Sequence, residues 1–168
     1  MHKLAICAGS FDPPTLGHLN IIERGLKIFD KLVVAVAVNT SKNPLLTVAE
    51  RIFLLESLLK NKKNVAVTSF DGLLVEFAKK AKCRTLLRGI RNMSDYEYES
   101  QMAIVNKTLH PEIETVFMMT EGKYSHLSST FIREVLTFGG SCEGMIHPTV
   151  EKILKQKLLK GKKNDLVC

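Results

Sequence analysis

The chain contains the sequence GSFDPPTLGH at residues 9–18, with two prolines, two glycines and a histidine at its end. Prolines and glycines disfavour the interior of a strand or a helix, so this stretch predicts a turn. The apolar run Leu4–Ala8 before it is typical of a buried strand, and residues 19–29 after it carry apolar side chains at helical spacing. The stretch therefore predicts a strand-to-helix turn, with His18 in the first turn of the helix.

The order of predicted elements repeats this strand-to-helix connection along the chain. Short apolar runs predict five strands, at Lys3–Ala8, Leu32–Val38, Asn64–Phe70, Arg84–Arg88 and Ile113–Met118. Helices are predicted at Leu16–Phe29, Val48–Lys60, Leu73–Lys82, Asp95–Leu109, Ser129–Phe138 and Thr149–Leu159. The strands lack polar alternation, which is typical of a parallel sheet covered on both faces. We expect an α/β fold: a single-domain, doubly wound (Rossmann-like), five-stranded parallel sheet with helices on both faces and a C-terminal helix.

Length and composition favour one ordinary globular domain. The chain has 168 residues, of which 45% are hydrophobic and 24% charged. No apolar run approaches the ~20 residues that a membrane-spanning helix needs, and Met1–Leu4 lacks the layout of a signal peptide. We expect a cytoplasmic protein with no membrane partner. We also expect the domain to occupy residues 1–160, followed by a disordered basic tail at 161–168.

The net charge of +7 suits an anionic partner, such as a nucleic acid or phosphorylated small molecules. Residues 151–168 hold six lysines against Glu151 and Asp165, so this end of the chain contributes +4 and the rest only +3. A lysine-rich end is more often a solvated helix face than a binding site. The charge therefore does not demand a nucleic-acid partner, and we expect none.

The predicted helix starts differ in chemistry. Thr47–Glu50 and Ser94–Glu97 both fit the capping box. In this motif the side chain of the first residue accepts the backbone N–H of the fourth, and the side chain of the fourth accepts the backbone N–H of the first. Thr15–His18 has histidine in place of the glutamate, and Ser128–Phe131 has phenylalanine. A helix N-terminus with free N–H groups is a ready anion site. These two starts therefore favour phosphate binding.

Several known catalytic loops are absent from the sequence. There is no GxGxxG after the first strand, no Walker A loop, no HExxH and no GxSxG, which disfavours dehydrogenases, P-loop kinases and serine hydrolases. The four cysteines show no metal-ligand spacing, and we expect no metal ligand from the chain. Loops that follow the strands of a doubly wound sheet share one edge, and there stand Ser10, His18, Lys42, Arg88 and Arg91. This set suits several phosphates at once.

Two motifs resemble those of the nucleotidylyltransferase superfamily. Gly9–Pro13 followed by Thr15-x-Gly17-His18 is similar to its first motif, G-[TS]-F-D-P and [HT]-x-G-H. Ser128-Ser129-Thr130-x-x-Arg133 is similar to the second, S-S-[ST]-x-[VI]-[RK]. The block Arg88-Gly89-Ile90-Arg91-Asn92, with acidic and tyrosine residues at 95–99, resembles the pantetheine-phosphate adenylyltransferase family. This resemblance covers Met1 to Leu159.

The resemblance implies a reaction and its partners. ATP and 4′-phosphopantetheine would form dephospho-coenzyme A and pyrophosphate, through in-line attack of the phosphopantetheine phosphate on the α-phosphate of ATP. Such a transfer depends on holding two anions together and stabilising the charge that moves between them. Mg²⁺ is expected on the ATP phosphates. The resemblance also implies a homo-oligomer, namely a hexamer.

The resemblance assigns roles to residues of this chain. His18 would stabilise the transition state at the α-phosphate, and whether its ring is neutral or cationic stays open, because the helix dipole and the phosphates favour opposite forms. The expected catalytic residues are Ser10, His18, Lys42 and Arg91. The expected phosphopantetheine contacts are Ser10, Lys42, Leu74 and Arg88, although Leu74 reads equally well as a core leucine. The expected ATP contacts are Ser10, Phe11, His18, Gly89, Ile90, Arg91, Glu99, Tyr124, Ser125, His126, Leu127, Ser128, Ser129 and Thr130.

Two alternatives remain at this point. One is a related enzyme that adenylylates another phosphate acceptor, such as a nicotinamide nucleotide, or transfers a nucleotide to glycerol phosphate; the Arg88–Arg91 block disfavours it. The other is a non-enzymatic nucleotide or RNA binder. Trp is absent and no cluster of aromatic residues is visible for stacking, so this alternative is also disfavoured.

Ser10 stands where the family usually has threonine, and this departure gives a prediction. Ser10→Thr keeps the hydroxyl and should be neutral or mildly improving, since the added methyl restricts the rotamer. Ser10→Val has nearly the shape of Ser10→Thr but lacks the hydroxyl. It should therefore lose a hydrogen bond to phosphate, worth ~1.5–3 kcal/mol, or roughly ten- to a hundred-fold in kcat/KM. Steady-state kinetics of the two variants decide the matter. Equal kcat/KM values would show that the hydroxyl does not bind phosphate.

Overall fold

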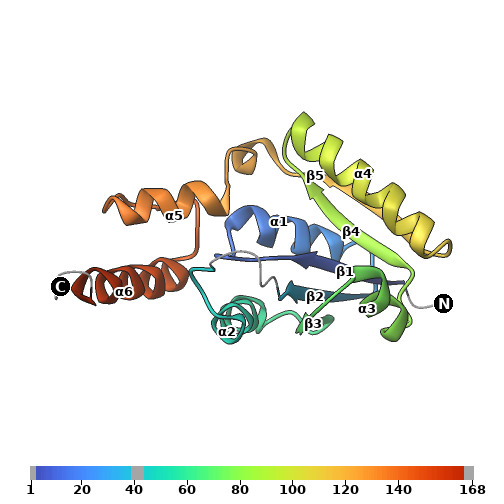
Figure 1. The fold of residues 1–168 in the computed structure, drawn as a ribbon, viewed down its shortest axis with the longest axis horizontal. Coiled ribbons are helices and arrows are strands. Elements are labelled where there is room, and N and C mark those ends of the chain that lie inside the picture. Colours follow the sequence, from blue (N-terminus) through green and yellow to red (C-terminus); the bar gives the residue numbers. More distant parts are fainter. Residues whose placement is uncertain (1–2, 39–43, 165–168) are drawn as a thin grey trace.

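The protein forms a five-stranded parallel sheet, seen in a computed structural model that describes residues 3–38 and 44–164 (Figure 1). The strands are β1 Leu4–Gly9, β2 Lys31–Ala37, β3 Val65–Phe70, β4 Thr85–Ile90 and β5 Glu114–Met119. Their order across the sheet is β3-β2-β1-β4-β5, and all four neighbouring pairs are parallel. The chain therefore winds outward from β1 in both directions, as a doubly wound sheet does. The predicted fold class is confirmed.

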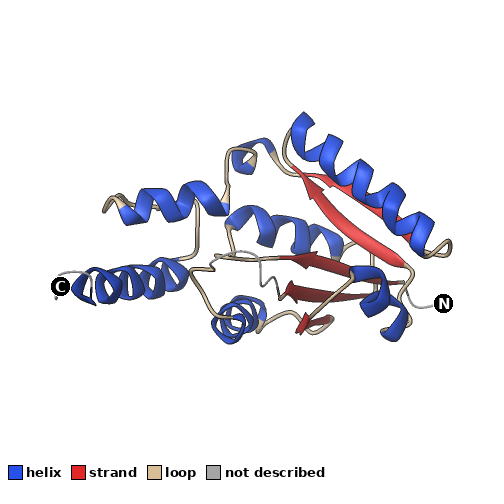
Figure 2. Cartoon of the chain, in the orientation of Figure 1, coloured by secondary structure: helices blue, strands red, loops and turns tan. Residues whose placement is uncertain are grey.

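Helices cover both faces of the sheet (Figure 2). Their bounds are α1 Leu16–Gly25, α2 Val48–Leu59, α3 Leu74–Lys80, α4 Met93–Leu109, α5 Ser129–Thr137 and α6 Pro148–Asn164. Apolar side chains of α1 and α2, including Ile22 and Leu55, share one core with β1 and β2. The α3 residues Val75 and Ala78 belong to a second core on the other face. None of the described helices is both long and apolar enough to cross a membrane.

The helices α5 and α6 extend beyond the sheet and pack on each other (Figure 1). A third core of buried side chains joins them to α2; its members include Leu54 on α2, Ile132 and Leu136 on α5, and Leu154 on α6. This arrangement holds the start of α5 near the carboxyl ends of the strands. The helix α6 continues to Asn164, past the Leu159 end that the sequence predicted. The prediction of a disordered tail at 161–168 stays a prediction.

The first helix ends earlier than its apolar pattern predicts, at Gly25 and not at Phe29. Residues after Gly25 close i→i+3 turns, with the N–H of Lys27 on Arg24 O and that of Ile28 on Gly25 O. A Cβ on Gly25 would lie 2.6 Å from Leu87 Cδ2 on β4. The glycine therefore lets α1 approach the sheet closely, and the apolar residues beyond it belong to the turn that leads into β2.

The cap of α4 also differs from the prediction. The sequence places a capping box at Ser94–Glu97, but the helix begins at Met93 and its cap is Asn92, whose side chain accepts the N–H of Asp95 at 2.9 Å. Asparagine caps a helix as well as serine does, and here the Asp95 carboxylate is held by Arg91. The other predicted capping box is confirmed, because Thr47 and Glu50 satisfy each other's backbone N–H groups. A 3₁₀ turn at Gly122–Tyr124 was not predicted.

Asp12, in the turn between β1 and α1, joins three parts of the chain. Its buried carboxylate accepts the backbone N–H groups of Leu45 and Leu46, each at 2.9 Å, and an Nη1–H of Arg133 on α5 at 3.3 Å. The side chain of Asp12 is only 8% exposed. A carboxylate with three such donors is stable in a buried position. Asp12 therefore ties the first turn to the segment before α2 and to α5.

We expect Asp12→Ala to destabilise the fold strongly. The substitution leaves two backbone N–H groups without their acceptor, at ~1–3 kcal/mol for each buried donor left unsatisfied. Urea unfolding followed by circular dichroism measures the loss. The matched control is Asp71→Ala, because within residues 3–38 and 44–164 Asp71 accepts only the N–H of exposed Gly72, and its loss should cost below ~0.5 kcal/mol. Equal stability of the two variants would contradict the anchoring role of Asp12.

Candidate active site

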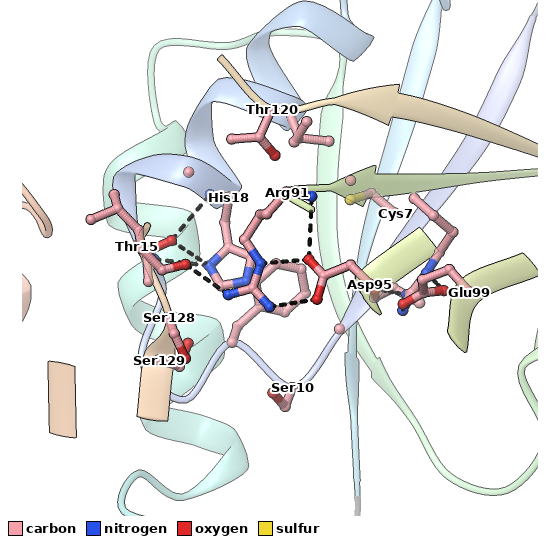
Figure 3. A pocket seen from close by; sticks show the side chains of 18 of the residues that line it. Cys7, Ser10, Thr15, His18, Arg91, Asp95, Glu99, Thr120, Ser128 and Ser129 are labelled. Carbon is pink, nitrogen blue, oxygen red and sulfur yellow. Dashed lines mark hydrogen bonds and ion pairs between the residues drawn. The ribbon is translucent and has the colours of Figure 1, made fainter. Parts of the chain in front are cut away.

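A cavity of about 310 Å³ opens at the carboxyl ends of β1, β4 and β5 (Figure 3). Its walls come from the end of β1 and the turn after it, the start of α1, β4, the first turns of α4 and the start of α5. This is the edge at which the sequence placed its polar residues. Of the residues predicted to contact ligands, the cavity wall contains Ser10, Phe11, His18, Arg88, Gly89, Arg91, Glu99, Leu127, Ser128, Ser129 and Thr130.

The other predicted site residues lie outside this wall. Ile90 is buried in the core, at 1% exposed. Leu74, at the start of α3, packs partly buried against the second core, as the alternative of a core leucine requires. Tyr124 lies beside the start of α1, where a Cβ on Gly17 would be 3.7 Å from it, and Ser125 and His126 follow. Lys42 lies outside the described residues.

His18 completes the cap of its own helix. Its Nδ1 accepts the backbone N–H of Thr15 at 3.0 Å, while Thr15 Oγ1 accepts the backbone N–H of His18 at 3.2 Å. The imidazole thus does what the glutamate does in an ordinary capping box. The expectation of several free N–H groups at this helix start is therefore wrong. His18 N–H is used in the cap, and Leu16 N–H donates to Met145 O at 3.0 Å.

The cap fixes the chemical form of the histidine. Because Nδ1 accepts a hydrogen bond from a backbone N–H, a neutral ring carries its proton on Nε2. Burial, and then the charges of Arg91 and Arg88, lower the pKa of His18 to about 4. The edge of the Phe11 ring packs on the imidazole, with the ring centroids 5.0 Å apart. The hydrogen bond to Nδ1 and the lowered pKa together favour a neutral ring that donates from Nε2.

Arg88 projects from β4 and is held by α4. Its Nε–H donates to Glu99 Oε2 at 2.7 Å, an Nη2–H donates to Glu99 Oε1, and an Nη1–H donates to the backbone carbonyl of Ala8. Glu99 thus binds the guanidinium with both oxygens, the strongest geometry for such a pair. Cys7 also lines the cavity, and burial raises the pKa of its thiol to about 11, so the thiol stays protonated.

Arg91 is held in the same way by Asp95. Its Nε–H and an Nη2–H donate to the two carboxylate oxygens at 2.7 and 2.9 Å, and an Nη1–H donates to Leu127 O at 2.8 Å. Hydrogen bonds from Arg91 lower the pKa of Asp95. Figure 3 shows Arg91 beside His18, with Asp95 on its other side. Both site arginines therefore have carboxylate partners on α4 and further N–H donors left for a ligand.

The start of α5 forms another wall of the cavity. Ser128 caps the helix and accepts the N–H of Thr130 at 3.2 Å, and Ser129 Oγ donates to Pro13 O at 2.9 Å. This second bond fastens α5 to the turn that carries Ser10. No acidic residue stands in the first turn of α5, so its positive dipole end faces the cavity without a neutralising carboxylate.

Some residues that shape the site were missed by the sequence analysis. Asp12 and Asp95 stood inside the quoted motifs, but nothing showed which groups they would bind. Thr120, just beyond the end of β5, lines the cavity, and Arg51 on α2 binds the carbonyl of Ser10 at 2.8 Å. Arg51 did leave a signal, because it stands on the helix face that carries Leu54, Leu55 and Leu58.

Comparisons with known proteins agree with this arrangement. The family model described as cytidylyltransferase-like matches residues 6–135. A protein of Caldanaerobacter subterraneus subsp. tengcongensis named phosphopantetheine adenylyltransferase is 49% identical over 159 residues, which cover 95% of this chain and 99% of that protein. A protein of the same name from Clostridium botulinum strain Eklund 17B is 51% identical over 144 residues, 86% of this chain and 91% of that one.

The chain belongs to the phosphopantetheine adenylyltransferase family. It is thus a nucleotidyltransferase, and the expectation drawn from its motifs is confirmed. A solved structure titled a putative nicotinate-nucleotide adenylyltransferase from Vibrio parahaemolyticus has the same fold, with a TM-score of 0.70. It is 22% identical and covers 94% of this chain and 95% of its own. That likeness concerns the fold alone.

The capped, half-buried histidine gives a prediction about protonation. We expect His18 to stay neutral, with the proton on Nε2, until the pH falls to about 4. Since the folded pKa lies below the unfolded value of about 6.5, protonation favours the unfolded chain, and stability should decrease as the pH falls from about 6.5 to about 4. Nitrogen-15 NMR of the imidazole measures both the tautomer and the pKa. A cationic His18 ring at pH 6 would contradict the prediction.

Proposed function

We propose that this cavity transfers the adenylyl group of ATP to 4′-phosphopantetheine and releases dephospho-coenzyme A and pyrophosphate. The observation that carries the proposal is the position of the His18 imidazole, which its cap holds in one cavity with Arg88, Arg91 and the Ser10 turn, and whose pKa is lowered there. An uncharged donor and two paired cations suit a reaction between two anions. The relatives that carry this activity in their names match almost the whole chain. The reaction belongs to coenzyme A biosynthesis, and we place it in the cytoplasm, where ATP is supplied.

Different residues of the chain bind different phosphates during the transfer. The Nε2–H of His18 donates to the α-phosphate and stabilises the charge that builds there as the acceptor phosphate attacks. The Ser10 hydroxyl and the remaining donors of Arg88 hold the attacking phosphate. Arg91 and the start of α5, from Leu127 to Thr130, hold the triphosphate, whose charge the positive dipole end of α5 favours. Together they keep the two anions in line, which is most of what this transfer requires.

Magnesium enters this site with the nucleotide. Both carboxylates in the cavity wall, Asp95 and Glu99, are already bound to arginines. Among the described residues no three His, Cys, Asp or Glu side chains lie close enough to hold a metal together. This donor set fits a cation that keeps several waters and binds through the ATP phosphates. When bound with the ATP phosphates, Mg²⁺ would neutralise phosphate charge, and Arg91 and the start of α5 would position the triphosphate.

The experiment that tests the proposal measures pyrophosphate release from ATP and Mg²⁺ with one phosphate acceptor at a time. We expect release with 4′-phosphopantetheine and background release with nicotinate mononucleotide, nicotinamide mononucleotide or glycerol phosphate. Mass spectrometry should find dephospho-coenzyme A in the first reaction only. Release with another acceptor alone would assign the site to a related enzyme. No release with any acceptor would remove the enzymatic proposal.

We expect His18→Asn to lower kcat by ~100-fold or more with little change in ATP binding. The side-chain oxygen of asparagine takes the place of Nδ1 and can accept the N–H of Thr15, while its shorter side chain places no donor at the position of Nε2. His18→Ala removes both, and should lose similar activity together with ~1 kcal/mol of stability. Single-turnover kinetics and thermal unfolding of the pair separate catalysis from capping. Near-normal kcat in His18→Asn would overturn the transition-state role.

We also propose that the chain forms a homo-oligomer through α4 and the edge strand β5. The helix α4 has no buried residue, and it exposes large apolar side chains that include Tyr98 (62%), Ile104 (67%) and Leu109 (54%). On β5, Met119 is 60% exposed. An edge strand and an apolar helix face exposed together favour association. The number of six subunits comes only from the family resemblance.

We expect Ile104→Glu to reduce the mass in solution, measured by light scattering after size exclusion. A charge at this position cannot be buried between copies of the chain without a partner. The control is Phe53→Glu, since Phe53 is equally exposed, at 61%, but lies on α2. It should leave the mass unchanged. A monomeric wild type, or an Ile104→Glu variant of wild-type mass, would exclude this interface.

A further inference from the structure

Arg51, on α2, is a buried cation that binds only backbone carbonyls in the described structure. It is 3% exposed. One Nη1 donates to Ser10 O at 2.8 Å and to Ala37 O at 3.3 Å, and Nε–H donates to Thr47 O at 3.4 Å. Buried arginines are usually paired with a carboxylate. Within residues 3–38 and 44–164 no ion pair of Arg51 occurs, and residues 39–43 contain no Asp or Glu.

The three carbonyls belong to segments that meet at the carboxyl edge of the sheet. Ser10 follows β1, Ala37 is the last residue of β2, and Thr47 caps α2. Arg51 itself is not in the cavity wall, whereas Ser10 is. The guanidinium thus does not line the cavity itself, but it binds the backbone of Ser10, which does.

The backbone next to Ser10 needs such support. Phe11 has a φ of 49°, in the left-handed region that a bulky residue rarely adopts. A strained conformation persists only where its surroundings hold it. The Arg51 bond to the Ser10 carbonyl and the packing of the Phe11 ring on His18 hold it from both sides. Without the guanidinium the turn can relax, and the Ser10 hydroxyl would leave its place at the cavity.

We propose that Arg51 is a positioning residue for the adenylyl transfer, which acts by holding the Ser10 hydroxyl toward the acceptor phosphate. The proposal rests on the proposed function of the cavity. It distinguishes Arg51 from a residue that only stabilises the fold. If Arg51 acts through Ser10, its contribution to catalysis should disappear once the Ser10 hydroxyl is gone.

A double-mutant cycle between Arg51→Gln and Ser10→Ala tests this dependence. We expect Arg51→Gln to lower kcat/KM for phosphopantetheine by ~10-fold when Ser10 is present, and by less than ~3-fold in the Ser10→Ala background. Arg51→Lys, which keeps the charge and one or two of the donors, should recover part of the loss. The proposal would be overturned if the fold-losses in kcat/KM of Arg51→Gln and Ser10→Ala multiply in the double variant, because the two residues would then act independently.

The matched control is Arg24→Gln. Arg24 also donates to a backbone carbonyl, that of Met119 at 2.6 Å, but among the described residues it makes no hydrogen bond to the Ser10 turn. Its effect on kcat/KM should be the same with and without the Ser10 hydroxyl. Suppose that the cycle of Arg24→Gln with Ser10→Ala is as non-additive as the cycle of Arg51→Gln with Ser10→Ala. Then any disturbance at the carboxyl edge of the sheet would produce non-additivity with Ser10, and the proposal would be overturned.

Two further measurements keep the outcomes apart. Circular dichroism and thermal unfolding show whether each variant is folded, and if Arg51→Gln is not, Arg51→Lys takes its place in the cycle. Unfolding of both would make Arg51 a purely structural residue and contradict the proposal. Wild-type pyrophosphate release with phosphopantetheine is measured in the same assay. If the wild type releases no pyrophosphate, the proposed function is contradicted. If it releases pyrophosphate but the effects of Arg51→Gln and Ser10→Ala are additive, only the role of Arg51 is contradicted.

Discussion

The carboxylate of Asp12 holds the active-site edge of this molecule together. It sits in the turn that carries Ser10 and His18, and it binds the backbone of Leu45 and Leu46 as well as Arg133. One side chain thereby connects the first crossover, the segment before the second and the helix α5. Because three segments far apart in sequence share this anion, none of them can shift without losing a buried hydrogen bond. Because the turn after β1 and the start of α5 both line the cavity, these bonds to Asp12 help to fix its shape.

The histidine of the first motif shows how a structural role can set a chemical one. As the reciprocal cap of α1, its Nδ1 must stay unprotonated to accept the N–H of Thr15. The same bond orients the ring and leaves the proton on Nε2 of a side chain that lines the cavity. Two nearby arginines and burial then make the cationic form unfavourable. A carboxylate in the same capping position would satisfy the helix equally well but would repel phosphate.

Much of this architecture could be predicted from the sequence because it depends on local signals. Uniform apolar runs marked all five strands within one or two residues, and the motifs marked Ser10, His18, Arg88 and Arg91 as members of one site. The misses depend on tertiary contacts. The close approach of α1 to β4 depends on Gly25 lying against Leu87, and Asp12 and Arg51 bind groups that are far away in the sequence. A spacing pattern names residue types, but it does not say which carbonyl a buried arginine will reach.

The pairs Arg88–Glu99 and Arg91–Asp95 also bear on which anions this basic protein accepts. Among the described residues of the cavity wall each cation has its own anion, so their charges nearly balance despite the +7 of the whole chain. For a diffuse polyanion such as RNA, the two carboxylates would offset the attraction of the arginines. A compact phosphate that reaches the remaining guanidinium donors and the His18 Nε2–H avoids most of that repulsion. The helix α4, which supplies both carboxylates, thus makes the site respond to the shape of an anion as well as to its charge.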